Sequence, residues 1–396
     1  MREIKDRATG RIDELADRLI RLSHDIHSHP EVSLTEYKSA AFIADMLQEE
    51  GFDVAMGVGG LDTAFIARRE GRSKQPHIAF LAEYDSLPGI GHACGHNVIA
   101  TCAVGAFLGT AAVMEDFEGT VSIIGTPGEE ADGGKIILLE QGVFDDVDFV
   151  LMMHPSSGKS LVGRGGRAAT SIDIDFTGKS AHSSAPGRGI NALNAVLSTF
   201  QHIDMLRPTF AMQDNVNGII TNGGLAANII PGEAACTFSL RAETLIDLER
   251  LAEKVIQAAN AAAALTGATP AISVHRMYAE RYPNVPMGAA FKANMAELGE
   301  EMEWANPKGM FGSSDIGNVS IKIPAIHDYL WIAPAGVNSH NLEYTEHSAS
   351  PRADEIAIKG GKGLAMTAID ILSSASFREE IKKAHLEQVP GEYRVQ

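Results

Sequence analysis

Residues 77–97 read HIAFLAEYDSLPGIGHACGHN, and this stretch decides the fold that the sequence predicts. It begins with an apolar run, residues 77–82, which is typical of a short buried strand. A loop follows in which one thiol and two imidazoles lie between His92 and His96. The uncharged run 98–114 comes next and predicts a helix. A strand, a polar loop and a helix in this order are typical of a parallel sheet with helices on its faces.

The uncharged run also contains Gly105-x-x-x-Gly109, a pattern found where membrane helices pack together. The run is slightly shorter than the ~20 apolar residues that a membrane span needs. It stands alone in the chain and directly follows the polar residues His96 and Asn97. We therefore expect a buried helix rich in small residues.

The alternation of strands and helices continues along the chain. Apolar runs predict buried strands at 121–125 and 149–153, with a helix over 133–141 between them. Two helices are expected upstream, over 11–27 and 35–50. The second follows Ser33-Leu34-Thr35-Glu36, which has the form of a capping box. This order predicts an α/β fold with a mostly parallel sheet, and such sheets bind ligands beyond the carboxyl ends of their strands.

Near Gly163 the pattern changes. Residues 170–176 alternate apolar and polar side chains, as a half-exposed strand does. Further elements are expected as helices at 191–205 and 245–264 and as strands at 218–221 and 234–241. We therefore predict an inserted α+β domain over 166–277. The metal-binding catalytic domain would be built from 1–165 and 278–396 and would end in a helix over 352–372.

Composition narrows the classes of function. The chain has 396 residues and a formal net charge of -18, from 33 basic and 51 acidic residues. That excess argues against nucleic acid and anionic membranes as partners. Three cysteines, Cys94, Cys102 and Cys236, are too few for a disulfide framework and fit a reducing cytoplasm. Residues 1–15 lack the apolar segment of a secretory signal, so we expect a cytoplasmic protein.

Polar residues follow each of the predicted parallel strands. Asp85 follows the first strand, Glu129 and Glu130 the second, and His154 the third. Because the carboxyl ends of parallel strands share one edge, these side chains should lie near the thiol and imidazoles described above. Thiolate, imidazole and carboxylate are ligands of transition metals. Of two adjacent glutamates, one can bind metal while the other faces its water and transfers protons.

Each of these residues also has a structural interpretation. Cys94 could be a small buried hydrophobe, and the two glutamates could form a solvated loop pair. His92 is expected in a supporting or loop role. His340 could complete the metal site from the far end of the chain, with His327 and His347 as competitors. The glycines of 163–166 do not join a strand directly to a helix, so they do not indicate dinucleotide binding.

Taken together, these motifs resemble one family. The sequence is similar to the amidohydrolase branch of the zinc-dependent aminoacylase and carboxypeptidase G metallopeptidases (clan MH). The resemblance runs from HDIHSHPE at 24–31 to the last predicted helix. Asn97 after Cys-Gly-His, and Glu83-Tyr84-Asp85 in place of Asp-Met-Asp, are closer to aminobenzoyl-glutamate hydrolase and β-alanyl-lysine dipeptidase-like members. These departures put hippurate-type specificity in doubt.

The resemblance implies roles for individual residues. Glu129 matches the general base of the family, and Asp85 the aspartate that supports the metal centre. The residues that match its metal ligands are Cys94, His96, Glu130, His154 and His340. The residues that match its substrate contacts lie in the inserted domain and are His182, Asn228 and Arg241.

The resemblance also implies a function and partners. It implies a metal-dependent amidohydrolase that cleaves a small N-acyl amino acid or dipeptide with a free carboxylate, using a metal-activated water and a glutamate base. It implies one or two Zn²⁺ per chain, with Mn²⁺, Co²⁺ or Ni²⁺ as alternatives. The inserted domain would be a ferredoxin-like lid and dimerisation domain, so a homodimer is expected. The alternatives are a non-catalytic metal-binding protein and a subunit that needs a partner chain.

Overall fold

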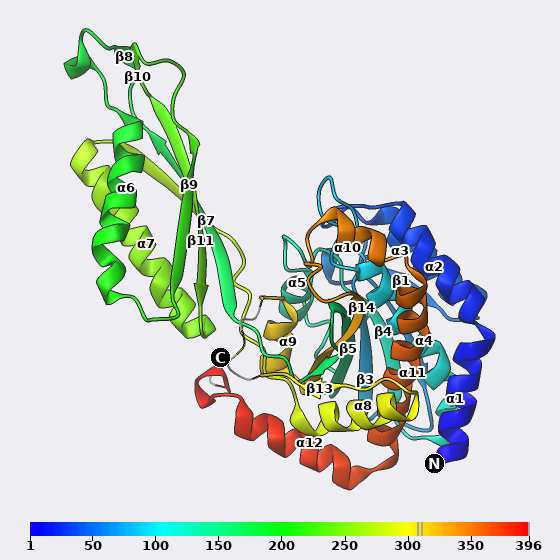
Figure 1. Cartoon of the computed structure of the whole chain (residues 1–396). Coiled ribbons are helices and arrows are strands. Elements are labelled where there is room, and N and C mark those ends of the chain that lie inside the picture. Colours follow the sequence, from blue (N-terminus) through cyan, green and yellow to red (C-terminus); the bar gives the residue numbers. More distant parts are fainter. Residues whose placement is uncertain (307–308, 310–311, 395–396) are drawn as a thin grey trace. The chain divides into compact units, whose positions relative to one another are not determined.

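A computed structural model describes residues 1–306, 309 and 312–394 of the chain (Figure 1). The chain divides into two compact units. Unit 1 contains Met1–Gly165 and the residues from Arg281 onward, and unit 2 contains Gly166–Glu280. The backbone of Tyr278 pairs with that of Ala169, so residues 278–280 lie in unit 2 rather than in the catalytic domain where the sequence analysis put them.

Unit 1 is built on a mixed sheet. Among the described residues its eight strands follow the order β1-β2-β4-β3-β5-β14-β6-β13. The central strands run parallel to one another and are β4 (Thr120–Gly125), β3 (His77–Ala82), β5 (Phe149–Ser157) and β14 (Ala325–Ala333). The outer strands are β1 (Val54–Met56), β2 (Phe65–Glu70), β6 (Leu161–Val162) and β13 (Glu303–Trp304). Every residue of β3 and β4 is buried, as expected for strands covered on both faces.

Helices cover this sheet (Figure 1). Those before the insertion are α1 (Arg2–Glu14), α2 (Ala16–Ser28), α3 (Tyr37–Glu49), α4 (His96–Ala111) and α5 (Gly134–Glu140). Those after it are α8 (Val285–Glu297), α9 (Ile316–Lys322), α10 (Leu342–His347), α11 (Pro351–Ser373) and α12 (Ala375–Gln388). Short 3-10 helices occupy Val58–Gly60, Met114–Asp116, Pro186–Arg188, Arg207–Thr209 and Gly391–Arg394.

Helix α4 is the uncharged run of the sequence, and all of its residues are buried. It packs against α1, α2 and α11. A Cβ at Gly109 would lie 2.8 Å from the carbonyl oxygen of Ala8, so glycine is what allows α1 to approach this closely. The prediction of a buried helix is confirmed. Among the described residues, the helices are too short or too polar for any of them to cross a membrane.

Some boundaries differ from the predictions. The single helix expected over 11–27 is two helices that meet at Leu15. The predicted capping box is wrong, because Glu31 caps α3 by accepting the backbone N–H groups of Lys38 and Ser39. The chain also continues past the predicted last helix into α12.

Unit 2 is a four-stranded antiparallel sheet with two helices. The strand order is β12-β7-β11-β9, and α6 and α7 pack on β7 and β11. The elements are β7 (Ala168–Thr177), α6 (Ala192–Leu206), β9 (Asn215–Asn222), β11 (Glu233–Ala242), α7 (Leu245–Thr266) and β12 (Thr269–Val274). A small hairpin of β8 (Ala181–His182) and β10 (Ile229–Ile230) extends from it. The βαββαβ order is ferredoxin-like, so the predicted fold class is confirmed.

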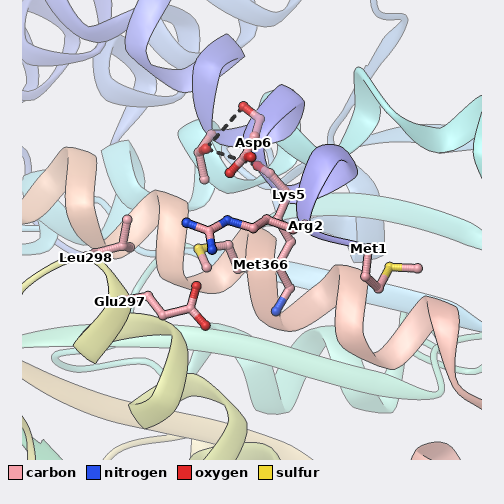
Figure 2. A pocket seen from close by; sticks show the side chains of 8 residues that line it. Met1, Arg2, Lys5, Asp6, Glu297, Leu298 and Met366 are labelled. Atoms are coloured by element: carbon pink, nitrogen blue, oxygen red, sulfur yellow. Dashed lines mark hydrogen bonds between the residues drawn. The ribbon is translucent and has the colours of Figure 1, made fainter.

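A polar hollow of about 470 Å³ lies between α1, α8 and α11 (Figure 2). The residues that line it are Met1, Arg2, Lys5, Asp6, Thr9, Glu297, Leu298 and Met366. Its half-buried cation is already neutralised, because the ammonium of Lys5 lies 2.7 Å from Asp370 and donates to Asn294 at 2.9 Å. The hollow is therefore a seam between helices rather than a site that calls for a ligand.

Candidate metal centre

The carboxyl ends of β3, β4 and β5 bring the metal-binding side chains together. Cys94 and His96 stand at the start of α4, on either side of Gly95. Gly95 has φ +78°, and a Cβ there would lie 2.9 Å from the ring of Pro155. Only glycine adopts this conformation at low cost, and it lets the loop turn directly into the helix.

His96 is oriented by Asp85. Its Nδ1 donates to the Asp85 carboxylate at 2.8 Å, and the other Asp85 oxygen accepts the backbone N–H of Glu130 at 2.9 Å. This contact turns Nε2 toward three carboxylates, with Glu83 at 3.4 Å, Glu130 at 3.8 Å and Glu129 at 3.9 Å. Nε2 is buried and has no hydrogen-bond partner. The arrangement is that of a metal-binding histidine held by a carboxylate.

The charges around His96 favour a cation. Burial lowers the pKa of His96, but the carboxylates of Asp85 and Glu83 outweigh it and raise that pKa well above its usual range. A positive charge at Nε2 is therefore stabilised, whether a proton or a bound metal ion carries it. The Oε1 atom of Glu130 is likewise buried without a partner.

Cys94 and His154 form a second contact. The Cys94 sulfur lies 3.5 Å from Nε2 of His154. The His154 Nδ1 donates to the carbonyl oxygen of Pro155 at 2.6 Å, so the neutral ring directs its lone pair at Nε2 toward the sulfur. Burial raises the pKa of the Cys94 thiol well above its usual range, and a metal ion would reverse that effect by binding the thiolate.

His340 completes the cluster from the C-terminal part of the chain. Its backbone N–H donates to Ala93 at 2.9 Å, and its Nε2 lies 3.6 Å from Glu130. The His340 side chain is 52% exposed, so it forms the open side of the site. Its φ of 64° shows that the loop is held in a left-handed turn at this point.

Among the described residues, the candidate ligand atoms form four overlapping groups of three, and in each group all atoms lie within 4.8 Å of one another. Glu129 belongs to two of them, with His96 and Glu130 and with Glu83 and Asp315. The other two share Cys94. One of these is Cys94, His96 and His154, and the other is Cys94, Glu130 and His340. Thiolate, imidazole and carboxylate suit zinc and related transition metals. The donor set and the unpartnered atoms of His96 and Glu130 therefore fit bound metal, with Cys94 shared between two positions.

Glu129 belongs to the two groups that lack Cys94 and is 7% exposed. Burial and the neighbouring carboxylates of Glu83 and Glu130 raise its pKa well above the usual range. A cluster that the sequence analysis missed adjoins it. Lys135 is fully buried and pairs with Glu83 and, at 2.7 Å, with Asp315.

The competing histidines lie outside the metal-ligand groups found among the described residues. His92 is buried and hydrogen-bonds the carbonyl oxygen of Ile26 at 3.1 Å. His347 lies at the end of α10. His327 lies beside His154, with ring centroids 5.2 Å apart, but its Nδ1 accepts a hydrogen bond from Arg281.

The three remaining predicted residues belong to unit 2. His182 and Asn228 lie together, because β8 pairs with β10 and the backbone of Ser183 donates to Asn228 at 3.0 Å. Both side chains are exposed. Arg241 lies on β11, opposite Ala169 of β7 and far along the strand from the hairpin. Unit 2 therefore pairs His182 with Asn228 but does not bring Arg241 to them.

Comparison with known proteins adds independent evidence. The model of the peptidase dimerisation domain of the M20 family matches residues 164–266. The chain is 36% identical to Xaa-Arg dipeptidase of Mus musculus, over 96% of this chain and 91% of that protein. It is 30% identical to a subunit of the p-aminobenzoyl-glutamate hydrolase of Escherichia coli, over 77% of this chain and 67% of that protein.

A solved structure shares the fold. It is a dinuclear metal-binding peptidase of the M20 family from Bacillus subtilis, with a TM-score of 0.68 and 22% sequence identity. The likeness covers 90% of this chain and 99% of that one. These relatives confirm the resemblance drawn from the motifs, and they are peptidases and amidohydrolases that cleave amide bonds. The chain belongs to the M20 family of metal-dependent peptidases and amidohydrolases.

Proposed function

We propose that this chain hydrolyses the amide bond of a small dipeptide or N-acyl amino acid that carries a free carboxylate. One observation supports this most strongly. A buried carboxylate, Glu129, has a ligand atom within 4.8 Å of those of His96 and Glu130, but it is not part of the two groups that contain Cys94. A purely structural metal site has no use for such a carboxylate, whereas hydrolysis requires it for proton transfer.

In this proposal Zn²⁺ is the native metal, because a thiolate and three imidazoles favour it. Mn²⁺, Co²⁺ and Ni²⁺ are alternatives. The ligands would be Cys94, His96, Glu130, His154 and His340. When bound, the cation supplies Lewis-acid chemistry, since it makes a nearby water acidic at neutral pH and polarises the carbonyl group.

The protein supplies the remaining chemistry. Glu129 takes the proton from the attacking water and delivers it to the leaving nitrogen. Asp85 keeps His96 oriented, and the Lys135 ammonium limits repulsion among the carboxylates that surround Glu129.

We assign substrate contacts and dimerisation to unit 2. His182 and Asn228 are exposed side by side and would reach the substrate carbonyl, while Arg241 is a candidate contact for the carboxylate. Strand β9 is at an edge of the sheet and exposes Ile219 and Ile220. An unpaired edge with apolar side chains favours pairing with a second copy, so we propose a homodimer through this strand.

The names of the relatives suggest the first substrates to test. An Xaa-Arg dipeptide and p-aminobenzoyl-glutamate each contain an amide bond next to a free carboxylate. The experiment measures hydrolysis of Ala-Arg and p-aminobenzoyl-glutamate by protein loaded with Zn²⁺, Mn²⁺ or Co²⁺. We expect turnover that disappears with a chelator and returns with metal. Stoichiometric metal without turnover of either compound would favour a non-catalytic metal-binding protein.

A second candidate is a subunit that requires a partner chain. The word "subunit" in the name of the Escherichia coli relative favours testing it. The mass of the active species in solution separates the two possibilities. A homodimer with full turnover supports the proposal, and turnover that appears only after a second chain is added supports the alternative.

A further inference from the structure

A small hollow borders the metal centre on the side of β14. The polar residues that line it are Arg164, Arg281, Ser320 and His327, and its apolar residues include Ile316 and Ile326. It offers about 10 Å³ to the centre of a water-sized group, which is about the space that one water molecule or one carboxylate oxygen takes. We call it the basic hollow.

The strand register places the basic hollow beside a metal-ligand residue. Tyr329 of β14 pairs with His154 of β5, and His327 lies two positions earlier on the same face of β14. The rings of His327 and Tyr329 lie 5.2 and 5.1 Å from the ring of His154, measured between centroids. A ligand in the basic hollow would therefore be next to the reacting amide.

Arg281 determines which ring nitrogen of His327 carries the proton. One guanidinium nitrogen donates to Nδ1 of His327 at 2.7 Å and to the hydroxyl of Tyr329 at 2.6 Å. The other donates to the carbonyl oxygen of Gly165 at 2.7 Å. Because a guanidinium can only donate, the His327 Nδ1 must accept, and the ring then carries its proton on Nε2.

Two buried donors consequently lack an acceptor. The Nε atom of Arg281 and the Nε2 atom of His327 are both buried without a hydrogen-bond partner. Arg281 is 7% exposed and His327 4%, so bulk water does not satisfy them. Unpaired buried donors are costly, and both residues line the same hollow. The missing partner is an acceptor.

The charge of the wall specifies that acceptor further. Arg164 also lines the hollow, with its guanidinium carbon 4.5 Å from the centroid of the Tyr329 ring. Two guanidinium groups around a space for one oxygen atom favour an anionic oxygen over a neutral one. One oxygen of a carboxylate has this size, charge and acceptor geometry.

We infer that the basic hollow binds the free carboxylate of the substrate and that Arg281, Arg164 and His327 select substrates that carry it. This inference rests on the proposed function and moves the carboxylate contact from Arg241 to residues of unit 1. The carboxylate carbon of a dipeptide is only a few bonds from the scissile carbonyl, which agrees with a subsite adjoining His154.

The test compares Ala-Arg with its C-terminal amide. Binding is measured by calorimetry to Glu129→Gln protein loaded with Zn²⁺, so the result does not depend on turnover. We expect the free acid to bind about 10-fold to 100-fold more tightly than the amide, as charge-assisted hydrogen bonds give. Arg281→Lys, made in the same background, should reduce this ratio about tenfold or more, because lysine keeps the charge but lacks the Nε–H donor.

Arg281 is buried, and its replacement can destabilise the fold, so a second variant is made at a more exposed residue. Arg164 is half-exposed, and Arg164→Gln should also lower the acid-to-amide ratio while the amide affinity and the bound metal stay unchanged. Arg68→Gln, at an exposed arginine of β2, is the matched control and should leave the ratio unchanged. Arg241→Gln tests the competing assignment.

The outcomes are distinct. Equal binding of acid and amide by Glu129→Gln, or an unchanged ratio in both Arg281→Lys and Arg164→Gln, would overturn the inference. The inference would also be overturned if only Arg241→Gln lowered the acid-to-amide affinity ratio. Failure of the metal-loaded natural chain to hydrolyse Ala-Arg and p-aminobenzoyl-glutamate would count against the proposed function, while the binding ratio would still decide the subsite.

Discussion

The metal centre and the basic hollow adjoin one another around His154, yet their unsatisfied atoms are of opposite kinds. At the metal centre, Oε1 of Glu130 and Nε2 of His96, which is an acceptor once its proton is lost, have no hydrogen-bond partner. In the basic hollow, Nε of Arg281 and Nε2 of His327 are donors without an acceptor. The first set calls for a cation and the second for an anion.

The partner of Nδ1 creates this difference between histidines. In His96 and His154, Nδ1 donates to an oxygen, so the neutral ring presents a lone pair at Nε2. In His327, Nδ1 accepts from a guanidinium, so the ring presents a proton at Nε2. In the proposed site the same side chain would therefore bind a metal ion in two positions and an anion in the third. The hydrogen-bond partner of Nδ1 thus decides whether the Nε2 atom of a histidine can bind a cation or an anion.

The largest effect is expected on turnover, when the proposed base Glu129 is replaced and the proposed metal ligands are kept. Glu129→Gln keeps the size and polarity of the side chain but cannot accept a proton. We expect kcat for Ala-Arg to fall by about 10²–10⁴-fold, with the metal content unchanged. Turnover and metal content are measured on the same preparation. Retained turnover would remove Glu129 from the role of base.

The next effect concerns the contact behind His96. Asp85→Asn removes the charge that orients this ring and stabilises a cation at Nε2. We expect the affinity for Zn²⁺ to drop about 10-fold to 100-fold in a competition titration. Asp354→Asn is the matched control, since Asp354 also hydrogen-bonds a histidine, His24 at 2.8 Å, at the surface. Equal losses in the two variants would contradict a specific role for Asp85.

A smaller effect is expected at Asp328. Its Oδ2 is also buried without a partner. Asp328 lies on the face of β14 opposite His327 and Tyr329, away from the metal centre and the basic hollow. Burial raises the pKa of Asp328 to about 7. The folded state then holds a proton between about pH 4 and 7 that the unfolded state has lost, so this residue makes the free energy of unfolding fall as pH rises.

Asp328→Asn should remove that contribution. The slope of the free energy of unfolding between pH 5 and 7 should become less negative by at most about 1.4 kcal/mol per pH unit. Urea unfolding of both proteins across this range measures it. An unchanged slope would show that Asp328 does not carry the proton.

Much of unit 1 could be predicted from sequence because its signals are local. The apolar run of β3 and the Cys94-Gly95-His96 loop mark a strand end and a helix start, and each lies within a few residues. The strands β4 and β5 follow the same pattern. The rule that ligands gather at carboxyl ends then brings Glu129, Glu130 and His154 together without any knowledge of packing.

The basic hollow could not be predicted in this way. It depends on β14, whose sequence AIHDYLWIA mixes polar and apolar residues and was not recognised as a strand. It also depends on the pairing of Tyr329 with His154, which joins distant parts of the chain. Lys135 was missed for a related reason, since its partners Glu83 and Asp315 lie in separate segments. Glu83 itself could have been found, because it directly follows β3.

One thiol, Cys94, belongs to two of the metal-ligand groups and is proposed to be shared by the bound metal ions. The direct test is metal stoichiometry of Cys94→Ala beside the natural chain, measured by titration with Zn²⁺ and elemental analysis, with Cys102→Ala as the control for a buried thiol outside these groups. We predict that Cys94→Ala loses tight binding of every Zn²⁺ that the natural chain holds, while Cys102→Ala keeps it. Unchanged stoichiometry and affinity in Cys94→Ala would contradict the shared metal centre.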